Sequence, residues 1–345
     1  MEPVSKLDVT SFLMRAEITP VIDVRSPSEY HAGHIPGAFN IPLFEDKERE
    51  AVGTEYKKEG KRKAILKGLE LMGPAMSGKL KNALAVALED KLLIHCWRGG
   101  MRSEAMAWLF SLGEIETCTL EGGYKAYRNH ILDSLSEKRK TIILGGFTGT
   151  SKTHILEYIR TSGNQVIDLE GIANHKGSAF GALGQPPQPT TEQFGNQLFV
   201  KWNQIDRNVP VWLEDESRNI GTVFLHDRFH INMQNAPTII LLLDIQKRLP
   251  RLIKEYSIYP PEALKSSIQK ISKRLGGDNA TDALKAVETG DFAKAIEITL
   301  NYYDKAYLFG IKKKNPENII YVTSDTDDIS ENARKVMEAA EKIVW

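Results

Sequence analysis

The sequence is poor in cysteine and in long apolar runs, and each shortage argues against a class of protein. Only Cys96 and Cys118 are present among 345 residues, so the sequence does not predict a disulfide framework. No uninterrupted apolar stretch approaches the length of a membrane span, and the first residues lack the basic start and apolar core of a secretory signal. We therefore expect a cytoplasmic protein with no membrane partner.

The sequence also lacks net charge, because 45 basic residues balance 45 acidic ones. The overall charge therefore gives no positive electrostatic potential that would indicate a nucleic-acid partner. A polyanion would have to be bound by local basic clusters, and the candidates are Lys57-Lys58, Lys61-Arg62-Lys63, Lys247-Arg248 with Arg251 and Lys254, and Lys312-Lys313-Lys314.

The length favours two domains, since globular domains usually span about 100–200 residues. In the first half, short apolar runs at 21–24 and 92–94 predict buried strands. In the second half, apolar runs alternate with helical stretches, which predicts an α/β fold with a largely parallel sheet and crossover helices. We expect one domain over residues 1–135 and a second over 136–345, with a helical region at about 246–310.

One cysteine lies in a loop whose composition suits an anion. Cys96 follows the predicted strand at 92–94, and a helical pattern begins at Ser103. Backbone N–H groups of a loop that leads into a helix stabilise an anion and lower a thiol pKa. We predict Cys96 as the catalytic nucleophile, with glycines that let the backbone approach the anion and arginines that supply charge. The predicted anion loop is Trp97, Arg98, Gly99, Gly100, Met101 and Arg102.

Cys118 lies in the run Glu116-Thr117-Cys118-Thr119-Leu120, which is typical of a strand. We expect it to be a structural residue, and a role as a resolving thiol stays open.

Several segments around this loop resemble the rhodanese superfamily. They are Asp23-Val24-Arg25 with Glu29-Tyr30, Gly33-His34-Ile35-Pro36-Gly37-Ala38, and Glu121-Gly122-Gly123-Tyr124. The resemblance covers about residues 1–130 and implies that Cys96 carries sulfur or selenium. The five residues between Cys96 and Arg102 are one more than a common sulfurtransferase loop has, and His-Cys-x5-Arg-Ser is also similar to the signature of cysteine-dependent phosphatases. Two interpretations stay open: phosphoester hydrolysis, or removal of a chalcogen from a selenophosphate-like donor.

A second loop has the composition of a phosphate-binding loop. A strand at 141–144 is followed by a glycine-rich loop, then Lys152-Thr153 and a helical pattern, which is close to the motif G-x-x-x-x-G-K-[ST]. Backbone N–H groups and Lys152 would bind a diphosphate, and Thr153 could ligate magnesium. Ser151 stands where the motif has glycine. The predicted diphosphate-binding residues are Gly146, Phe147, Thr148, Gly149, Thr150, Ser151, Lys152 and Thr153.

Acidic residues follow the apolar run at 209–213, as they would in a metal-assisting strand end. Glu214, Asp215 and Glu216 are the alternatives, and Asp215 is our first choice. We predict no tightly bound cofactor.

The whole chain resembles the tRNA 2-selenouridine synthases, which join a rhodanese domain to a P-loop domain in this order. Beyond the two loops, the resemblance is carried by 168–178, 212–221 and 302–307. His175, Lys176 and Arg218 lie in these segments and could contact phosphate or base. The resemblance implies a transferase that converts wobble 2-thiouridine in tRNA to S-geranyl-2-thiouridine with geranyl diphosphate, and then to 2-selenouridine with selenophosphate.

The resemblance also implies tRNA and a selenophosphate donor system as partners. Two other hypotheses stay open. One is a catalytically silent rhodanese fold fused to a nucleotide-sensing domain, and the other is a cysteine phosphatase fused to a P-loop kinase.

Overall fold

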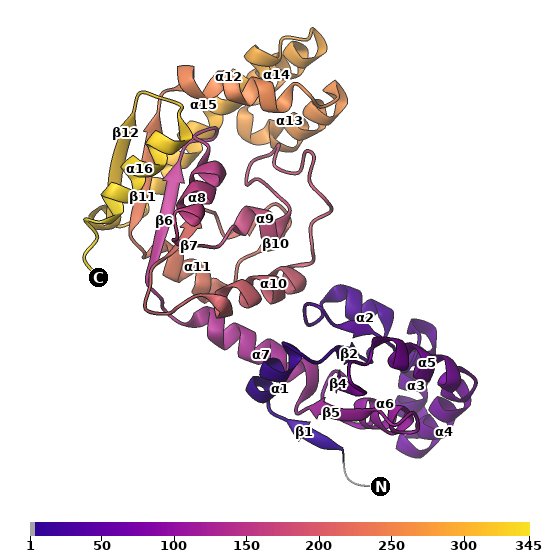
Figure 1. Ribbon diagram of the computed structural model, residues 1–345. Coiled ribbons are helices and arrows are strands. Elements are labelled where there is room, and N and C mark those ends of the chain that lie inside the picture. The colour runs from indigo at the N-terminus through magenta and orange to yellow at the C-terminus, as the bar shows by residue number, and fades with distance from the viewer. Residues whose placement is uncertain (1–3) are drawn as a thin grey trace. The chain divides into compact units, whose positions relative to one another are not determined.

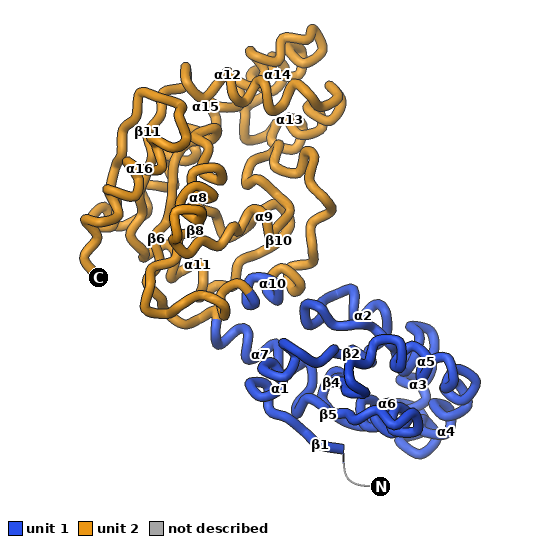
Figure 2. Tube along the Cα trace, viewed as in Figure 1, with its two compact units in different colours: residues 1–134, 195–200 blue, residues 135–194, 201–345 orange. Residues whose placement is uncertain are grey.

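The computed structural model describes residues 4–345, and the chain folds into two compact units (Figure 2). The first unit contains residues up to 134 together with 195–200, and the second contains 135–194 and 201–345. Residues 195–200, which the sequence analysis assigned to the second domain, therefore pack with the first unit.

The first unit is built around a sheet of five parallel strands in the order β1-β5-β4-β2-β3 (Figure 1). The strands expected at 21–24 and 92–94 are β2 and β4, and Cys118 lies on β5. The bounds are β1 (Ser5–Leu7), β2 (Val21–Asp23), β3 (Phe39–Asn40), β4 (Lys91–His95) and β5 (Glu116–Leu120).

Helices pack on this sheet and close its core. Ile22 and Ile94 on the central strands are fully buried against Phe110 of the helix that follows the Cys96 loop. The helices of this unit are α1 (Val9–Ala16), α2 (Pro27–Ala32), α3 (Asp46–Glu59), α4 (Lys61–Met72), the 3₁₀ turn η1 (Gly73–Ala75), α5 (Met76–Val86), α6 (Met101–Ser111) and α7 (Gly123–Ser136).

The second unit contains another sheet of five parallel strands, in the order β12-β11-β6-β8-β7. Its central strands read as continuous apolar runs because both faces of such a sheet are covered. The strands are β6 (Thr141–Gly146), β7 (Gln165–Val166), β8 (Val211–Glu214), β11 (Thr238–Leu243) and β12 (Ile319–Ser324), with a separate antiparallel pair β9 (Asn219–Ile220) and β10 (Val223–Phe224).

Helices α8 and α16 bury their apolar residues against β6, β8 and β11, and α12 to α15 form a helical region with its own apolar core (Figure 1). The α/β class is confirmed, with a rhodanese-like first part, a P-loop-like parallel sheet and helices across the region expected at 246–310. None of the helices within residues 4–345 is long and apolar enough to cross a membrane. The helices are α8 (Lys152–Thr161), α9 (Leu169–Ala173), α10 (Thr191–Gln204), α11 (Asp227–Gln234), α12 (Ile245–Tyr256), α13 (Pro261–Leu275), α14 (Gly277–Glu288), α15 (Phe292–Ile311), the 3₁₀ turn η2 (Pro316–Asn318) and α16 (Ile329–Ala340).

Candidate functional site

Cys96 lies at the carboxyl end of the central strand β4, directly before the loop that leads into α6. Its side chain is buried, with 3% of its surface exposed. The Cys96 Sγ lies 3.4 Å from the Ser103 hydroxyl, a contact in which either group can donate, and the same hydroxyl lies 2.9 Å from the Gly100 carbonyl, so its single proton can go to the carbonyl or to the sulfur. The sulfur therefore has a polar partner inside a buried loop.

The main chain of the loop is held by the start of α7. The Tyr124 N–H donates to the Cys96 carbonyl at 2.8 Å, and the Lys125 N–H donates to the Trp97 carbonyl at 3.0 Å. These two hydrogen bonds fix the main chain of Cys96 and Trp97 against the start of α7.

The pKa of the Cys96 thiol is lower than its ordinary value. Burial raises the pKa, but the hydrogen bonds from the Ser103 side chain and from the N–H groups of Gly100, Arg98 and Ser103 outweigh burial. These donors stabilise the thiolate, as the sequence analysis predicts for this loop.

Gly99 has a packing role that the sequence analysis did not find. It has φ near 65°, and a Cβ there would lie 2.4 Å from the Leu120 carbonyl oxygen. Gly123 approaches from the other side, where a Cβ would lie 2.4 Å from the Cys96 carbonyl oxygen. Gly99 thus lets two loops pack together, whereas the space at Gly100 would accept a side chain.

Arg102, predicted as a cation of the anion loop, is paired with an acidic residue. Its guanidinium pairs with Glu29 on α2, with Nη1 2.8 Å from Oε2 and Nη2 3.4 Å from Oε1. Arg98 is exposed, and within residues 4–345 no ion pair engages its guanidinium. Arg98 is therefore the loop cation that can meet an incoming anion.

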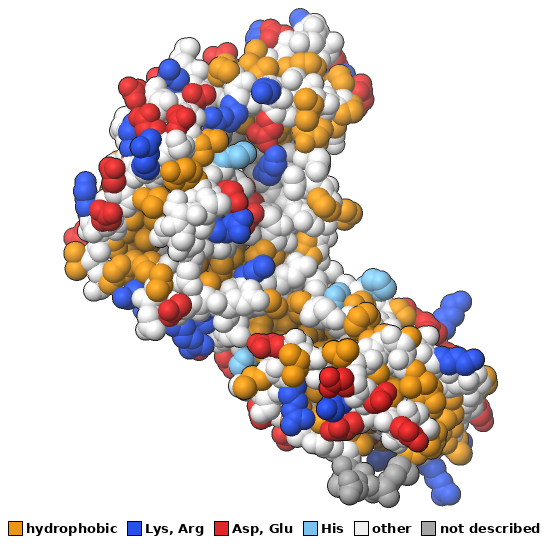
Figure 3. Space-filling view, viewed as in Figure 1, with side chains coloured by type: hydrophobic (Ala, Val, Ile, Leu, Met, Phe, Trp, Pro, Cys, Tyr) orange, Lys and Arg blue, Asp and Glu red, His pale blue; other side chains and the backbone are white. Residues whose placement is uncertain are grey.

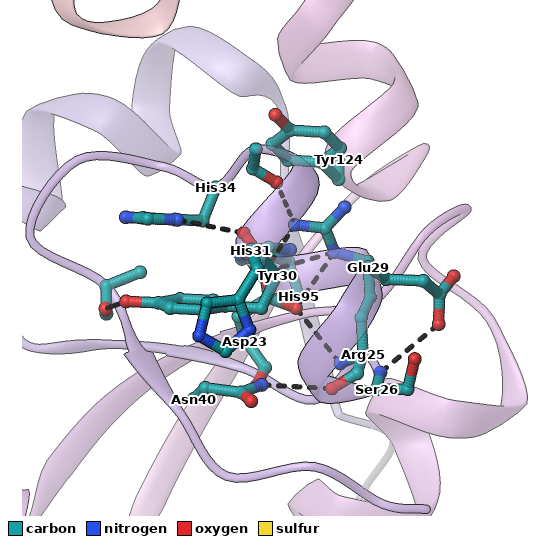
Figure 4. Close-up of polar contacts among 12 residues, drawn as sticks. Asp23, Arg25, Ser26, Glu29, Tyr30, His31, His34, Asn40, His95 and Tyr124 are labelled. Carbon is teal, nitrogen blue, oxygen red and sulfur yellow. Dashed lines mark hydrogen bonds and ion pairs between the residues drawn. The ribbon is translucent and has the colours of Figure 1, made fainter. Parts of the chain in front are cut away.

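A buried polar group supports the strand ends beneath the loop (Figure 4). Arg25 Nη2 donates to Asp23 Oδ2 and to the Gly33 carbonyl, both at 2.6 Å, and its guanidinium carbon lies 3.8 Å from the Tyr124 ring centroid. His95 is fully buried beside Asp23, and burial holds its pKa below the ordinary value. This group is enclosed, so it supports the loop instead of contacting a ligand.

The second predicted loop connects β6 to α8. The Lys152 Nζ donates to the Gly146 carbonyl at 3.0 Å, and Thr150 Oγ1 donates to the Phe147 carbonyl at 2.9 Å. Ser151 has φ near 63°, a left-handed conformation that costs a residue with Cβ roughly 1–2 kcal/mol. This explains why glycine is the common residue there, and the loop keeps its shape with serine.

Arg248 on α12 binds the main chain of this loop through the Thr148 carbonyl. It is 2% exposed, and it donates to the Thr148 carbonyl at 3.0 Å and to both carboxylate oxygens of Asp304 on α15. Its guanidinium carbon also lies 4.9 Å from the Phe147 ring centroid. The sequence analysis named Arg248 only in a basic cluster, because nothing local connects it to Asp304.

A cavity of about 640 Å³ opens beside the loop. Gly146, Thr148, Gly149 and the segment from Ser151 to His154 line one part of it. Leu252, Tyr256, Tyr302, Tyr303, Ala306 and Tyr307 also line it, and so do the acidic residues Asp168, Glu170, Asp215, Glu216 and Glu255. The cavity therefore joins a phosphate-binding loop to a wall that can contact a hydrocarbon chain.

Asp215, our first choice among the three acids, is engaged by neighbouring residues. Lys314 Nζ donates to its Oδ1 at 2.5 Å, and the Tyr307 hydroxyl donates to its Oδ2 at 3.0 Å. The Tyr307 oxygen in turn accepts the Gly146 N–H at 2.8 Å. Asp215 thus fixes a tyrosine against the loop.

The other two acids are also buried. Glu214 accepts the Leu169 N–H at 2.9 Å, and burial raises its pKa well above the ordinary value. Burial and the neighbouring Glu170 raise the pKa of Glu216 in the same direction. Both carboxyls therefore favour the protonated form.

The side chains present do not form a magnesium site. The Thr153 hydroxyl donates to Glu170 Oε2 at 3.1 Å, and Asp215 is neutralised by Lys314. Within residues 4–345, no three acidic, histidine or cysteine side chains come together in a set that could hold a metal ion without other ligands. We therefore route no step through a metal ion.

The three remaining predicted contacts lie in different places. Lys176 lines the cavity and pairs with Glu255 at 2.5 Å. His175 is almost fully buried, and burial lowers its pKa. Arg218 pairs with Asp227 at 2.7 Å and does not line the cavity.

Two of the predicted basic clusters are smaller at the surface than the sequence suggests, because Arg248 and Lys314 are buried in ion pairs. On the face drawn in Figure 3, basic and acidic side chains are interspersed over both units. On this face a polyanion would therefore contact isolated basic side chains and not a continuous positive patch.

Comparison with known proteins agrees with this two-part organisation. Residues 8–130 match the model of the rhodanese-like domain, and residues 139–340 match that of the tRNA 2-selenouridine synthase AAA domain. The tRNA 2-selenouridine synthase of Nitrosomonas europaea is 32% identical over 86% of this chain and 90% of its own length. The enzymes of that name from Sulfurovum sp. and Shewanella piezotolerans are 34% and 36% identical over 88% of this chain and 91% of their own length. The chain belongs to the tRNA 2-selenouridine synthase family.

Proposed function

We propose that this protein converts 2-thiouridine at the wobble position of tRNA to 2-selenouridine through an S-geranyl intermediate. Geranyl diphosphate and selenophosphate are the two small substrates. The main support is that one chain contains both an activated thiol in an anion loop and a phosphate-binding loop beside a partly aromatic cavity. The family relatives carry the name of a tRNA 2-selenouridine synthase.

The first step takes place at the Lys152 loop. The thiouridine sulfur attacks C1 of the geranyl group, the S–C bond forms, and the C–O bond to the diphosphate breaks. The N3 proton of the base is lost, which leaves a neutral S-geranyl base. Lys152 and the N–H groups of the loop stabilise the charge that builds up on the departing diphosphate.

The cavity wall accounts for the hydrocarbon part of this substrate. Leu252, Ala306 and the four tyrosines can cover a geranyl chain, and each buried CH₂ group contributes about 0.8 kcal/mol. Burial raises the pKa of Tyr303 to about 12, so its hydroxyl stays protonated and neutral beside the chain.

The second step takes place at Cys96. Geranylation turns the sulfur at C2 into a better leaving group, and selenium from selenophosphate replaces it. The thiolate of Cys96 activates the selenium donor, and covalent catalysis divides the transfer into two easier steps.

The wobble base must leave its stack to reach either loop. Trp97 lies directly beside Cys96 with 36% of its surface exposed, and Arg98 follows it. A stacking ring and a free cation are the groups that hold a single-stranded nucleotide, so these two residues are the strongest candidates for base and phosphate contacts.

Nucleoside mass analysis tests the proposal directly. A tRNA or anticodon stem-loop that contains 2-thiouridine is incubated first with geranyl diphosphate and then with selenophosphate. We expect S-geranyl-2-thiouridine after the first addition and 2-selenouridine after the second. A product that forms only when ATP is added, or phosphoester hydrolysis in place of selenium transfer, would favour the phosphatase and kinase alternative.

A further inference from the structure

We propose that the Cys96 thiolate attacks the phosphorus of selenophosphate, so that the sulfur receives the phosphoryl group and selenium leaves as hydrogen selenide. This inference rests on the proposed function and specifies the chemistry of its second step. It differs from a cysteine that carries selenium, which the rhodanese resemblance implies.

The balance of electrons separates these two routes. If the sulfur bonded to selenium, the electron pair of the Se–P bond would go to phosphorus, and the product would be phosphite, which is P(III). If the sulfur bonds to phosphorus, the pair stays on selenium, phosphorus remains P(V), and the selenide takes a proton. The second route needs no oxidant or reductant beyond the substrates.

The geometry of the loop fits attack at phosphorus. Five residues separate Cys96 from Arg102, the Ser103 hydroxyl lies 3.4 Å from the sulfur, and the first N–H groups of α6 are donors that the helix itself leaves unsatisfied. A phosphoryl group bound to that sulfur would place its oxygens among the same donors. A tetrahedral oxyanion can use several N–H groups, whereas a single terminal selenium atom would leave most of them without a partner.

The charged residues around the loop also favour attack at phosphorus. Arg102 is held by Glu29, so the exposed guanidinium of Arg98, which has no ion pair within residues 4–345, is the loop cation that can attract a highly charged donor. His95, the residue before the nucleophile, is enclosed with a lowered pKa and is neutral at pH 7. Recruitment of the donor therefore depends on backbone N–H groups and Arg98.

Two further bond changes complete the turnover. Hydrogen selenide attacks C2 of the S-geranyl base, the C2–Se bond forms, the C2–S bond breaks, and geranyl thiolate leaves and takes a proton. Water then attacks the phosphocysteine, the S–P bond breaks, and inorganic phosphate leaves. The Ser103 hydroxyl, 3.4 Å from the sulfur, stabilises the thiolate that departs in this last step.

Mass spectrometry of the acid-quenched protein distinguishes the two adducts. The full-length protein is mixed with selenophosphate without oxygen and quenched at short times. The adducts have nearly the same nominal mass, but selenium has a broad isotope pattern and phosphorus has a single isotope. We expect a monoisotopic phosphoryl adduct on the peptide that contains Cys96. Cys96→Ser should lack it, and Cys118→Ser, which changes the other cysteine, should retain it.

Ser103→Ala traps the same intermediate. Because the thiolate becomes a poorer leaving group, the phosphoryl adduct, once formed, should hydrolyse several-fold more slowly than in the wild type after the excess selenophosphate is removed. A selenium isotope pattern on Cys96, phosphite in the phosphorus NMR spectrum, or no phosphoryl adduct in either the wild type or Ser103→Ala would overturn the inference.

The nucleosides of the same reactions distinguish this inference from the proposed function. If the wild type makes 2-selenouridine while Cys96 carries selenium, only the chemistry of the donor is wrong. If no 2-selenouridine forms from an S-geranyl substrate, the proposed function itself fails.

Discussion

The hydroxyl of Ser103 is the residue-scale feature on which the reactivity of Cys96 depends most. It is the side chain within hydrogen-bonding distance of the sulfur, and it comes from the first turn of α6. The other donors to the sulfur are backbone groups, which a substitution cannot remove. Ser103 therefore offers a test of the activated thiol that leaves the loop in place.

Ser103→Ala should raise the pKa of Cys96. The folded protein holds this pKa below its ordinary value, so losing a donor shifts ionisation to higher pH and leaves several-fold less thiolate at neutral pH. Thiolate ultraviolet absorbance, followed against pH with Cys96→Ser as the blank, measures the shift. An unchanged titration would mean that the backbone N–H groups alone set the pKa.

The sequence located the two loops, but it did not indicate the distant partners of their side chains. Cys96, Lys152 and the two loops follow from local order, because a strand, a loop and a helix are continuous in sequence. The pairing of Arg102 with Glu29 could not be read, since 73 positions separate them. Ser103 stood inside the His-Cys-x5-Arg-Ser segment, which was the one available signal for its role.

At the scale of elements, α15 is the helix that shapes the phosphate-binding loop. Asp304 fixes Arg248 beneath the Thr148 carbonyl, and Tyr307, one turn later, binds the Gly146 N–H. A Cβ at Gly145 would lie 2.3 Å from the Tyr307 hydroxyl, so glycine is required there. The helix thus positions the first residues of the loop.

Asp304→Asn should weaken geranylation without unfolding the protein. Arg248 would lose its charged partner and hold the Thr148 carbonyl less firmly, and small displacements of a binding loop can cost up to about 10²-fold in rate. The Michaelis constant for geranyl diphosphate and the rate of geranyl transfer measure the effect. Asp325→Asn, which changes the exposed partner of Lys335 on α16 away from the cavity lining, is the control.

Helix α10 contributes a buried side chain to the first unit. Asn196 donates to the Tyr124 hydroxyl and to the His34 carbonyl, both at 2.8 Å, and accepts from Arg128. Tyr124 in turn contacts Arg25 and supplies the N–H that binds the Cys96 carbonyl. A residue far along the chain therefore supports the cysteine loop.

Asn196→Leu should destabilise the first unit by about 1–3 kcal/mol, because buried polar groups lose a partner. Chemical denaturation followed by protease sensitivity of residues 4–134 measures the loss. Gln204→Leu, on the last turn of the same helix, should have little effect. Equal stability of the two variants would contradict a structural role for Asn196.

Element boundaries show where sequence patterns reach their limit. The apolar run at 165–169 reads as one strand, but β7 ends at Val166 and Leu169 begins α9. The reason is local: the Asp168 carboxylate accepts the Gly171 N–H at 2.6 Å and starts a helix. Parallel strands and the long helical region were predictable because their patterns repeat over many residues.

At the scale of the whole molecule, the two proposed reactions, geranyl transfer and selenium transfer, take place in two different compact units. The unit with Cys96 has its own sheet and core, and so does the unit with Lys152 and the cavity. Each loop follows a parallel strand at its carboxyl end, where such sheets place ligands. The central claim is therefore that selenium chemistry and geranyl transfer can be removed separately.

One measurement tests this claim most directly: nucleoside mass analysis of a 2-thiouridine tRNA after incubation of two folded variants with both donors. Cys96→Ser should accumulate S-geranyl-2-thiouridine and form no 2-selenouridine. Lys152→Ala should leave 2-thiouridine largely unconverted, with geranylation lower by about 10²-fold or more, yet it should convert a substrate that is already geranylated. Loss of both reactions in either variant, with the fold intact, would contradict separate roles for the two loops.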